Sequence, residues 1–186
     1  MYLLIRQSLI IFISATLILY SVGINAKQSK KPGFETKEFK ISLFPRTINQ
    51  TIAFYTGRGF PQSALDEFKS MCFITIGVNN KGTNRVWFDL DNWHFKTEVG
   101  LLKRRLRPEW VQRWNKIGLE KRFQSTFRWT LMPEKMGLYT HEGEGGNVTL
   151  LRTDKPITIT GTLYVGKDKS KSYPIEIKNV LCARDQ

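Results

Sequence analysis

The sequence predicts a mainly β protein, an antiparallel two-layer β-sandwich with one or two short helices. Short apolar segments separated by turns with Gly, Asn or Pro dominate the chain, and several alternate apolar and polar residues, as strands with one buried face do. Helical spacing of apolar residues occurs in only two places, and the segments lack the regular strand–helix alternation of a parallel sheet.

The first half of the chain supplies four predicted strands and one helix. Residues 39–44 alternate apolar and polar side chains and predict a strand, and residues 50–55 predict a second strand that ends at a Gly-Arg-Gly turn. Pro61 opens a predicted helix over 61–71. The apolar segment 72–78, the turn at 79–82 and the segment 85–90 together predict a β-hairpin.

The second half supplies the other helix and the remaining strands. Trp110, Trp114 and Ile117 recur at helical spacing after Pro108, and Gly118 follows, so a helix is predicted over 107–117. Strands are predicted at 126–131, 147–152, 157–165 and 173–182. The pattern resembles exported immunoglobulin-like domains in its general look, although the Cys…Trp…Cys spacing of antibody domains is absent.

Residues 1–26 have the parts of an export signal. Arg6 lies near the start, the centre is dominated by Leu, Ile, Phe and Ala, and Ala26 precedes a charged run. Because the apolar stretch is rather long, an uncleaved membrane anchor is the alternative. We therefore expect an exported protein, periplasmic or secreted, in which residues 27–186 form a single β-sandwich domain.

Two cysteines, Cys72 and Cys182, are present in the whole sequence. In an exported chain an isolated pair predicts one disulfide. A thiolate metal or redox site is the weaker interpretation, because the chain has no CxxC motif.

The formal net charge is +13, and without Arg6 it would be +12. Such an excess favours polyanionic surroundings, such as lipid head groups, lipopolysaccharide or acidic polysaccharide, and nucleic acid is not expected outside the cytoplasm. The segment 103–128 alone carries a net charge of +7. Its predicted anion- or partner-binding residues are Lys103, Arg104, Arg105, Arg107, Arg113, Lys116, Lys121 and Arg122. The alternative is that the tryptophans of this segment are core residues and its arginines are merely solvated.

Two other functional classes are alternatives to binding. Met132, Met136 and His141 are soft or imidazole ligands that would suit a copper-handling periplasmic protein, although their spacing matches no known motif. A hydrolase would need a site that the sequence does not reveal, because no GxSxG motif is present. We expect a non-enzymatic binding or accessory protein of the cell envelope that needs no cofactor. It would engage a protein or an anionic envelope component, the membrane surface included, through the basic segment.

Overall fold

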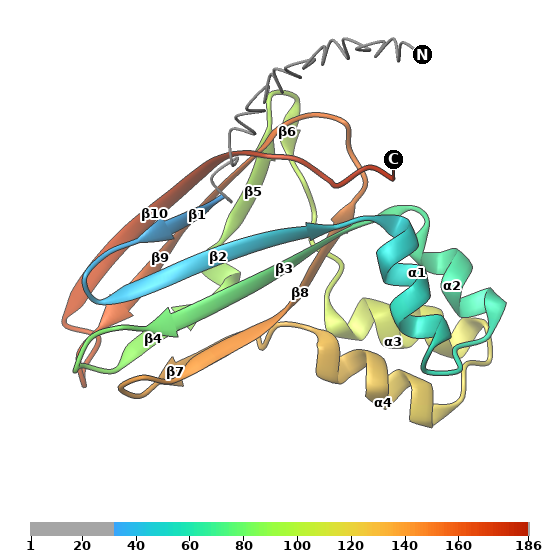
Figure 1. The fold of residues 1–186 in the computed structure, drawn as a ribbon, viewed down its shortest axis with the longest axis horizontal. Coiled ribbons are helices and arrows are strands. Elements are labelled where there is room, and N and C mark those ends of the chain that lie inside the picture. The colour runs from blue at the N-terminus through green and yellow to red at the C-terminus, as the bar shows by residue number, and fades with distance from the viewer. Residues whose placement is uncertain (1–31, 186) are drawn as a thin grey trace, which may run out of the picture.

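A computed structural model describes residues 32–185, so the predicted export signal lies outside the described residues. Within this range two antiparallel sheets pack face to face, and four helices gather at one end of the molecule (Figure 1). This arrangement confirms the predicted β-sandwich. None of the helices in residues 32–185 is long and apolar enough to cross a membrane.

The first sheet has the strand order β1-β2-β3-β8, and β3 pairs with both neighbours along its length. The strands are β1 (Gly33–Glu35), β2 (Phe39–Arg46), β3 (Met71–Asn80) and β8 (Gly143–Leu151). Side chains alternate between the faces of β3, so Ile74 and Ile76 enter the sandwich core while Phe73 and Thr75 point outward. The predicted strands at 39–44, 72–78 and 147–152 are thus all in this sheet.

The second sheet is organised around β9 (Ile157–Val165). On one side β9 pairs with β10, and on the other it pairs with β5 and then β4. The other strands are β4 (Val86–Asp89), β5 (His94–Thr97), β6 (Gly100–Leu101), β7 (Lys135–Leu138) and β10 (Lys171–Val180). A short 3₁₀ turn, η1 (Leu90–Asn92), separates β4 from β5. Trp93 follows it and lies directly over Gly161, where a Cβ atom would approach the indole ring to 2.7 Å.

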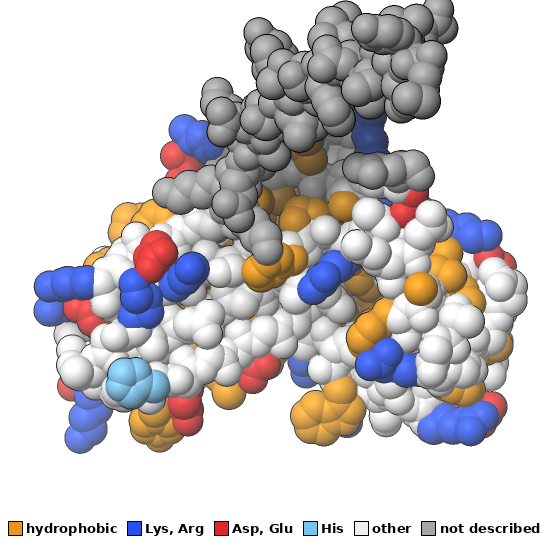
Figure 2. Space-filling model, viewed as in Figure 1, with side chains coloured by type: hydrophobic (Ala, Val, Ile, Leu, Met, Phe, Trp, Pro, Cys, Tyr) orange, Lys and Arg blue, Asp and Glu red, His pale blue; other side chains and the backbone are white. Residues whose placement is uncertain are grey.

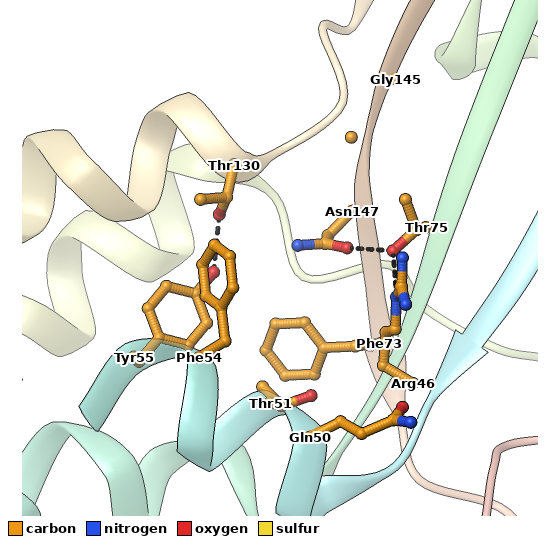
Figure 3. Close-up of a pocket in the computed structure, with 11 residues that line it drawn as sticks. Arg46, Gln50, Thr51, Phe54, Tyr55, Phe73, Thr75, Thr130, Gly145 and Asn147 are labelled. Atoms are coloured by element: carbon orange, nitrogen blue, oxygen red, sulfur yellow. Dashed lines mark hydrogen bonds between the residues drawn. The ribbon is translucent and has the colours of Figure 1, made fainter. Parts of the chain in front are cut away.

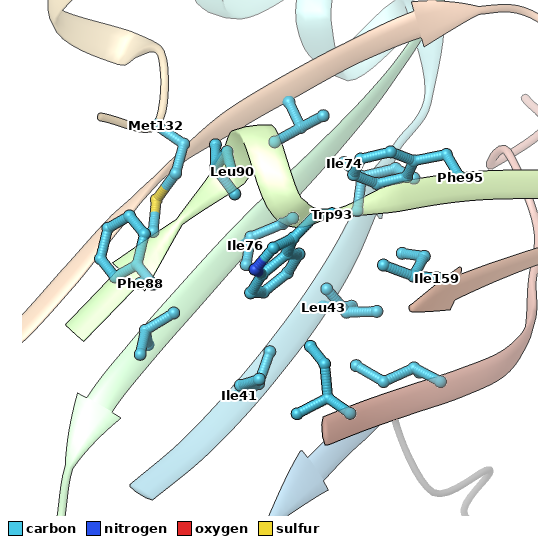
Figure 4. Close-up of a cluster of buried hydrophobic side chains, with 14 of the residues drawn as sticks. Ile41, Leu43, Ile74, Ile76, Phe88, Leu90, Trp93, Phe95, Met132 and Ile159 are labelled. Atoms are coloured by element: carbon cyan, nitrogen blue, oxygen red, sulfur yellow. The ribbon is translucent and has the colours of Figure 1, made fainter. Parts of the chain in front are cut away.

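The core between the sheets is built from fully buried aliphatic and aromatic side chains (Figure 4). Ile41 and Leu43 from β2 meet Phe88, Phe95 and Ile159 from the second sheet. Burying one such side chain contributes about 1.5–3 kcal/mol, so the apolar faces of the two sheets supply the main force that holds them together.

Two predicted strands are helices in the structure. The segment 50–55 lies within α1 (Ile48–Thr56), and the segment 126–131 lies mostly within α4 (Lys121–Thr130). Thr47 caps α1 and forms a capping box with Gln50, a local helix-start signal that outweighs the β-branched and aromatic residues that follow. The predicted helices are confirmed as α2 (Gln62–Phe68) and α3 (Arg107–Lys116). Residues 32–185 therefore contain four helices where one or two were expected.

The predicted hairpin over 72–90 is also wrong. β3 belongs to the first sheet and β4 to the second, so the turn between them crosses from one layer to the other. Two alternating apolar segments joined by a turn have the same local pattern whether they pair with each other or lie in different sheets. The pairing partners of β4, which are β7 and β9, come from later in the chain.

A disulfide joins Cys72 near the start of β3 to Cys182, just beyond the end of β10. It confirms the predicted pairing, with the two Cα atoms 5.5 Å apart. The cysteines are 110 positions apart, and in the chain-entropy description a loop of about this length contributes roughly 4–5 kcal/mol to stability. The bond thus links the two sheets covalently at the helical end of the sandwich.

Asn80 links the two sheets at the opposite end of β3. Its side chain is only 3% exposed, and its amide nitrogen donates to the carbonyl oxygens of Asn84, Leu138 and Tyr139 at 2.8–3.1 Å. Its amide oxygen accepts from the backbone N–H of Gly82 at 3.0 Å. One buried amide therefore ties the last residue of β3 to the start of β4 and the end of β7.

Replacing Asn80 with Ala should lower the free energy of unfolding by about 2–3 kcal/mol, because buried carbonyl groups would lose their donor. Asn79→Ala is the matched control, since Asn79 is exposed, and it should change stability by no more than about 0.5 kcal/mol. Urea unfolding of both variants measures the difference. Equal unfolding midpoints for the two variants would contradict this role of Asn80.

Candidate functional site

The four helices cover one end of the outer face of the first sheet. An aromatic cluster joins them to the sheet, with Phe68 of α2 at its centre. The Phe68 ring lies 5.4 Å from Phe73 of β3, 6.0 Å from Trp110 and 5.6 Å from Phe127, measured between centroids. Trp110 and Trp114 are fully buried, so the tryptophans of the basic segment are core residues.

The basic segment divides into an inner and an outer group. Arg104 belongs to the inner group, with a side chain only 12% exposed. Its guanidinium donates to Glu134 at 2.9 Å and lies 3.6 Å from Asp91. Arg107 donates to the carbonyl oxygens of Leu131 and Met132 at 3.3 and 3.4 Å. These two arginines hold the chain segments before α3 and after α4 together.

Arg105 completes the inner group. Its guanidinium lies 4.8 Å from the centre of the Trp110 ring, and burial lowers the pKa of the group. Its backbone N–H donates to the carbonyl oxygen of Thr149, and its own carbonyl accepts from the Thr149 hydroxyl. Residues 104–105 therefore run along the outer edge of β8.

The outer group consists of Lys103, Arg113, Lys116, Lys121 and Arg122, all of them exposed. Carboxylates pair with three of these residues: Lys103 with Glu109, Arg113 with Glu67, and Arg122 with Glu120. Figure 2 shows the same mixture on one face, where some basic side chains at the helical end lie beside acidic ones and others do not. The eight basic residues predicted to bind an anion or a partner therefore do not form one unneutralised cationic face.

Three cations of α3 and α4 remain without a carboxylate. Among residues 32–185, no ion pair involves Lys116, Lys121 or Arg128. Lys121 donates to the neutral side chain of Asn115 at 3.1 Å, which brings the start of α4 close to the end of α3. Trp129 follows Arg128 and is 81% exposed, an unusual position for a tryptophan side chain.

The division into an inner and an outer group predicts that removing an inner arginine lowers the free energy of unfolding more than removing an outer one. Arg104→Gln should lower the free energy of unfolding by about 1–3 kcal/mol, because Glu134 loses a charged hydrogen-bond partner in a shielded place. Arg122→Gln removes an ion pair with both partners mostly exposed and should cost less than about 1 kcal/mol. Thermal unfolding at equal ionic strength compares them. If Arg104→Gln lowered the free energy of unfolding no more than Arg122→Gln does, the inner group would not have a structural role.

The structure does not bring the predicted copper ligands together. Met132 is buried in the sandwich core, and Met136 lies opposite Phe88 in the register of β4 and β7, so it faces the same core. His141 is exposed in the turn before β8. The backbone N–H of Met132 donates to the carbonyl oxygen of Asn147, whereas His141 lies before Gly143 at the start of β8. Gly143 and Asn147 are four positions apart, about 13 Å along a strand, so Met132 and His141 are well separated. Among the described residues, no three His, Cys, Asp or Glu side chains are placed to hold a metal ion.

A pocket of about 490 Å³ lies between α1 and the outer face of the first sheet (Figure 3). Its volume is within the range of small-molecule sites. Helix α1 supplies Gln50, Phe54 and Tyr55, and Thr130 closes the side at the end of α4. The sheet supplies Phe73, Gly145 and the polar residues Arg46, Thr75 and Asn147.

The polar residues of the pocket are linked by hydrogen bonds. Arg46 Nε donates to Thr75 Oγ1 at 2.9 Å, and Thr75 Oγ1 lies 2.7 Å from Asn147 Oδ1. On the opposite wall, the hydroxyl groups of Tyr55 and Thr130 are 2.6 Å apart. Since the Thr130 hydroxyl donates to the carbonyl of Phe127, Tyr55 is the donor in this pair.

Burial raises the pKa of Tyr55 to about 12, because the side chain is 1% exposed. An unfolded tyrosine ionises near pH 10. Between these values the folded state retains a proton that the unfolded state loses, so Tyr55 makes the protein less stable as the pH rises above 10.

Comparison with Tyr55→Phe isolates this effect. Between about pH 10 and 12 the wild-type protein should lose up to roughly 1.4 kcal/mol per pH unit relative to the variant. Tyr139→Phe, at an exposed tyrosine outside the pocket, is the control for the loss of a phenol hydroxyl. Denaturant unfolding at several alkaline pH values measures both. Parallel curves for wild type and Tyr55→Phe would mean that the phenol ionises normally.

No local pattern in the sequence marks this pocket. Residues 50–55 were expected in a strand, so the shared orientation of Gln50, Phe54 and Tyr55 on a helix could not be inferred. Arg46, Thr75 and Asn147 come from three strands, and their alignment follows from the register, in which Thr75 pairs with Asn147 and Arg46 with Phe73. The one local signal was the Thr47–Gln50 capping box, which places the start of α1.

No protein-family model and no curated protein matches the sequence. Three solved structures share a loose likeness of fold. The candidate lipoprotein ycdA of Bacillus subtilis subsp. subtilis str. 168 has a TM-score of 0.42 at 10% identity, and the match covers 81% of this chain and 39% of ycdA. The GAE domain of GGA2p from Saccharomyces cerevisiae has a TM-score of 0.40 at 8% identity, covering 80% of this chain and 94% of that domain.

The yjhA protein of Bacillus subtilis has a TM-score of 0.41 at 7% identity, covering 77% of this chain and 94% of yjhA. The chain thus spans less than half the length of ycdA and nearly all of the other two. At these values the likeness carries no functional information.

Proposed function

We propose that this chain is an exported, non-enzymatic binding or accessory protein of the cell envelope. It engages an anionic envelope component through the exposed cations of α3 and α4. The disulfide supports an oxidising compartment, outside the cytoplasm, because such bonds are rare in reducing ones. The predicted export signal agrees with that location.

The observation that carries this proposal is the unpaired state of Lys116, Lys121 and Arg128 among the described residues. Lys121 and Arg128 are seven positions apart on α4 and share its exposed side with Ser125. Lys116 joins them through the contact of Lys121 with Asn115. Uncompensated like charges on neighbouring helices repel one another, and an anionic partner would relieve that repulsion.

The composition of this surface favours a polyanion over a folded protein partner. Lysine is depleted in protein–protein interfaces, which depend on buried aromatic and arginine side chains. Spaced, flexible cations instead suit a diffuse array of negative groups. The exposed Trp129 beside Arg128 adds an amphipathic ring of the kind found at membrane interfaces. Anionic lipid headgroups therefore fit the surface best.

A charge-reversal experiment tests the proposal. The protein should bind vesicles that contain phosphatidylglycerol and not vesicles of phosphatidylcholine alone, and binding should weaken as salt increases. The triple variant Lys116→Glu, Lys121→Glu and Arg128→Glu should bind at least tenfold more weakly. Vesicle co-sedimentation and the blue shift of tryptophan fluorescence measure binding.

The matched control reverses three exposed lysines away from α3 and α4, in β5, in the turn after β9 and in β10: Lys96→Glu, Lys167→Glu and Lys171→Glu. It changes the net charge equally and should retain most of the binding. Equal losses in both triple variants would show that total charge matters rather than this surface. Binding to an acidic protein from envelope extract, with none to vesicles, would replace the lipid partner by a protein one.

A further inference from the structure

The pocket beside α1 is separate from the basic helices, and its hydrogen bonds have a fixed direction. Arg46 Nε can only donate, so the Thr75 hydroxyl accepts from it and must direct its own proton to Asn147. Asn147 therefore uses its carbonyl oxygen in this bond. Its NH₂ group lies on the other side of the amide, toward the Tyr55 and Thr130 wall (Figure 3), and one of its N–H groups is directed to the Tyr55 hydroxyl. Both ends of the chain of hydrogen bonds are thus donors.

The charge of the pocket is positive and unbalanced. Among residues 32–185, no ion pair involves Arg46, and its Nη atoms are not used in the bond to Thr75. None of the residues that line the pocket is acidic. Glu144 is the acidic residue next to the lining residue Gly145. Its side chain belongs to the opposite face of β8, because Glu144 pairs with the inward-facing Val78. The Nη groups of Arg46 are therefore available to an anion, and so is the N–H of Asn147 that does not point to the Tyr55 hydroxyl.

One wall of the pocket is aromatic. Phe54 is 41% exposed, and Phe73 forms the wall behind it (Figure 3). The floor continues from Thr75 and Asn147 to Gly77 and Gly145, which pair across β3 and β8. Since neither glycine carries a side chain, the backbone of the sheet is open to a ring-shaped ligand.

The N-terminus of α1 adds no second anion site. Its first turn is capped by Thr47 and Gln50, and the carboxylate of Asp185 accepts from the backbone N–H of Asn49 at 3.0 Å, so the amide groups that would otherwise attract a phosphate are already used. The Arg46 guanidinium is therefore the one cationic group among the residues that line the pocket. A guanidinium matches the geometry of a carboxylate closely.

We propose that this pocket binds a small carboxylate with a ring or short apolar body. The carboxylate accepts hydrogen bonds from Arg46 Nη and Asn147 Nδ2, and the body lies against Phe54 and Phe73 over the glycine floor. This site would give the protein a small-molecule ligand in addition to any polyanion held by α3 and α4.

Titration of the purified protein with benzoate, phenylacetate and cyclohexanecarboxylate tests the proposal. Benzamide and inorganic phosphate are the comparison probes, because benzamide keeps the ring without the charge and phosphate keeps a charge without the ring. Nitrogen-15 NMR follows the side-chain signals of Arg46 Nε–H and Asn147 NH₂, and calorimetry gives the affinity. At least one carboxylate should shift both signals to saturation, and benzamide should bind at least tenfold more weakly.

Two variants assign the binding to the pocket. Arg46→Gln should weaken carboxylate binding at least tenfold, while Arg184→Gln, an equal change of charge at an exposed arginine outside this pocket, should not. Asn147→Asp keeps an acceptor for Thr75 and replaces the NH₂ donor by a negative oxygen. Because the two side chains have the same size, this variant should abolish carboxylate binding through charge alone. Thermal unfolding confirms that each variant is folded.

Four results would overturn the proposal. The first three are the absence of any carboxylate-induced shift in these two signals, equal affinity for benzamide, and unchanged carboxylate affinity in Arg46→Gln. Saturation by phosphate alone would make the site one for phosphate groups and would equally reject a carboxylate. None of these outcomes bears on vesicle binding by α3 and α4, which uses different residues.

Discussion

The attachment of β3 at both of its ends is the constraint on which the rest of the structure depends. Cys72 fixes the start of this strand to the second sheet by a covalent bond, and Asn80 fixes its end by hydrogen bonds. Between these points β3 is packed on both faces: Ile74 and Ile76 enter the sandwich, and Phe73 meets the helical aromatic cluster. A change in the position of β3 would therefore disturb both hydrophobic clusters at once.

The helical layer depends on that strand in turn. Phe73 contacts Phe68 of α2, and through it the tryptophans of α3 and Phe127 of α4. The inner arginines hold the segments on either side of α3 and α4, so the cations that remain on the outside project from a fixed support. The pocket has the same origin, since its floor is the part of the sheet that the helices leave uncovered.

The features predicted correctly are those that local sequence determines. The apolar alternation of 72–78 and 157–165 reflects one buried face, and the Pro and Gly that flank 107–117 mark the ends of a helix. The segments 50–55 and 126–131 are short and rich in aromatic or β-branched residues, so their propensity favoured strands. A local capping box starts α1 over the first segment, and packing of Phe127 in the aromatic cluster favours the helix over the second. The disulfide was predictable because there was only one way to pair two cysteines.

The candidate sites were harder to predict because they depend on contacts between distant segments. The neutralisation of Arg104 and Arg113 involves Glu134 and Glu67, which lie 30 and 46 positions away. The pocket assembles Arg46, Thr75 and Asn147 through the pairing of three strands. Neither the charge of the basic segment nor any local spacing contains that information.

The edge of β8 has a consequence for aggregation. An open strand edge can pair with another molecule and start the growth of oligomers or fibrils. Here the backbone of residues 104–105 and 131–132 occupies that edge, with hydrogen bonds to Thr149 and Asn147. Arg107 binds residues 131 and 132 and so holds this cover in place. The arginines that the sequence suggested for binding a partner thus help to keep the folded chain from joining copies of itself.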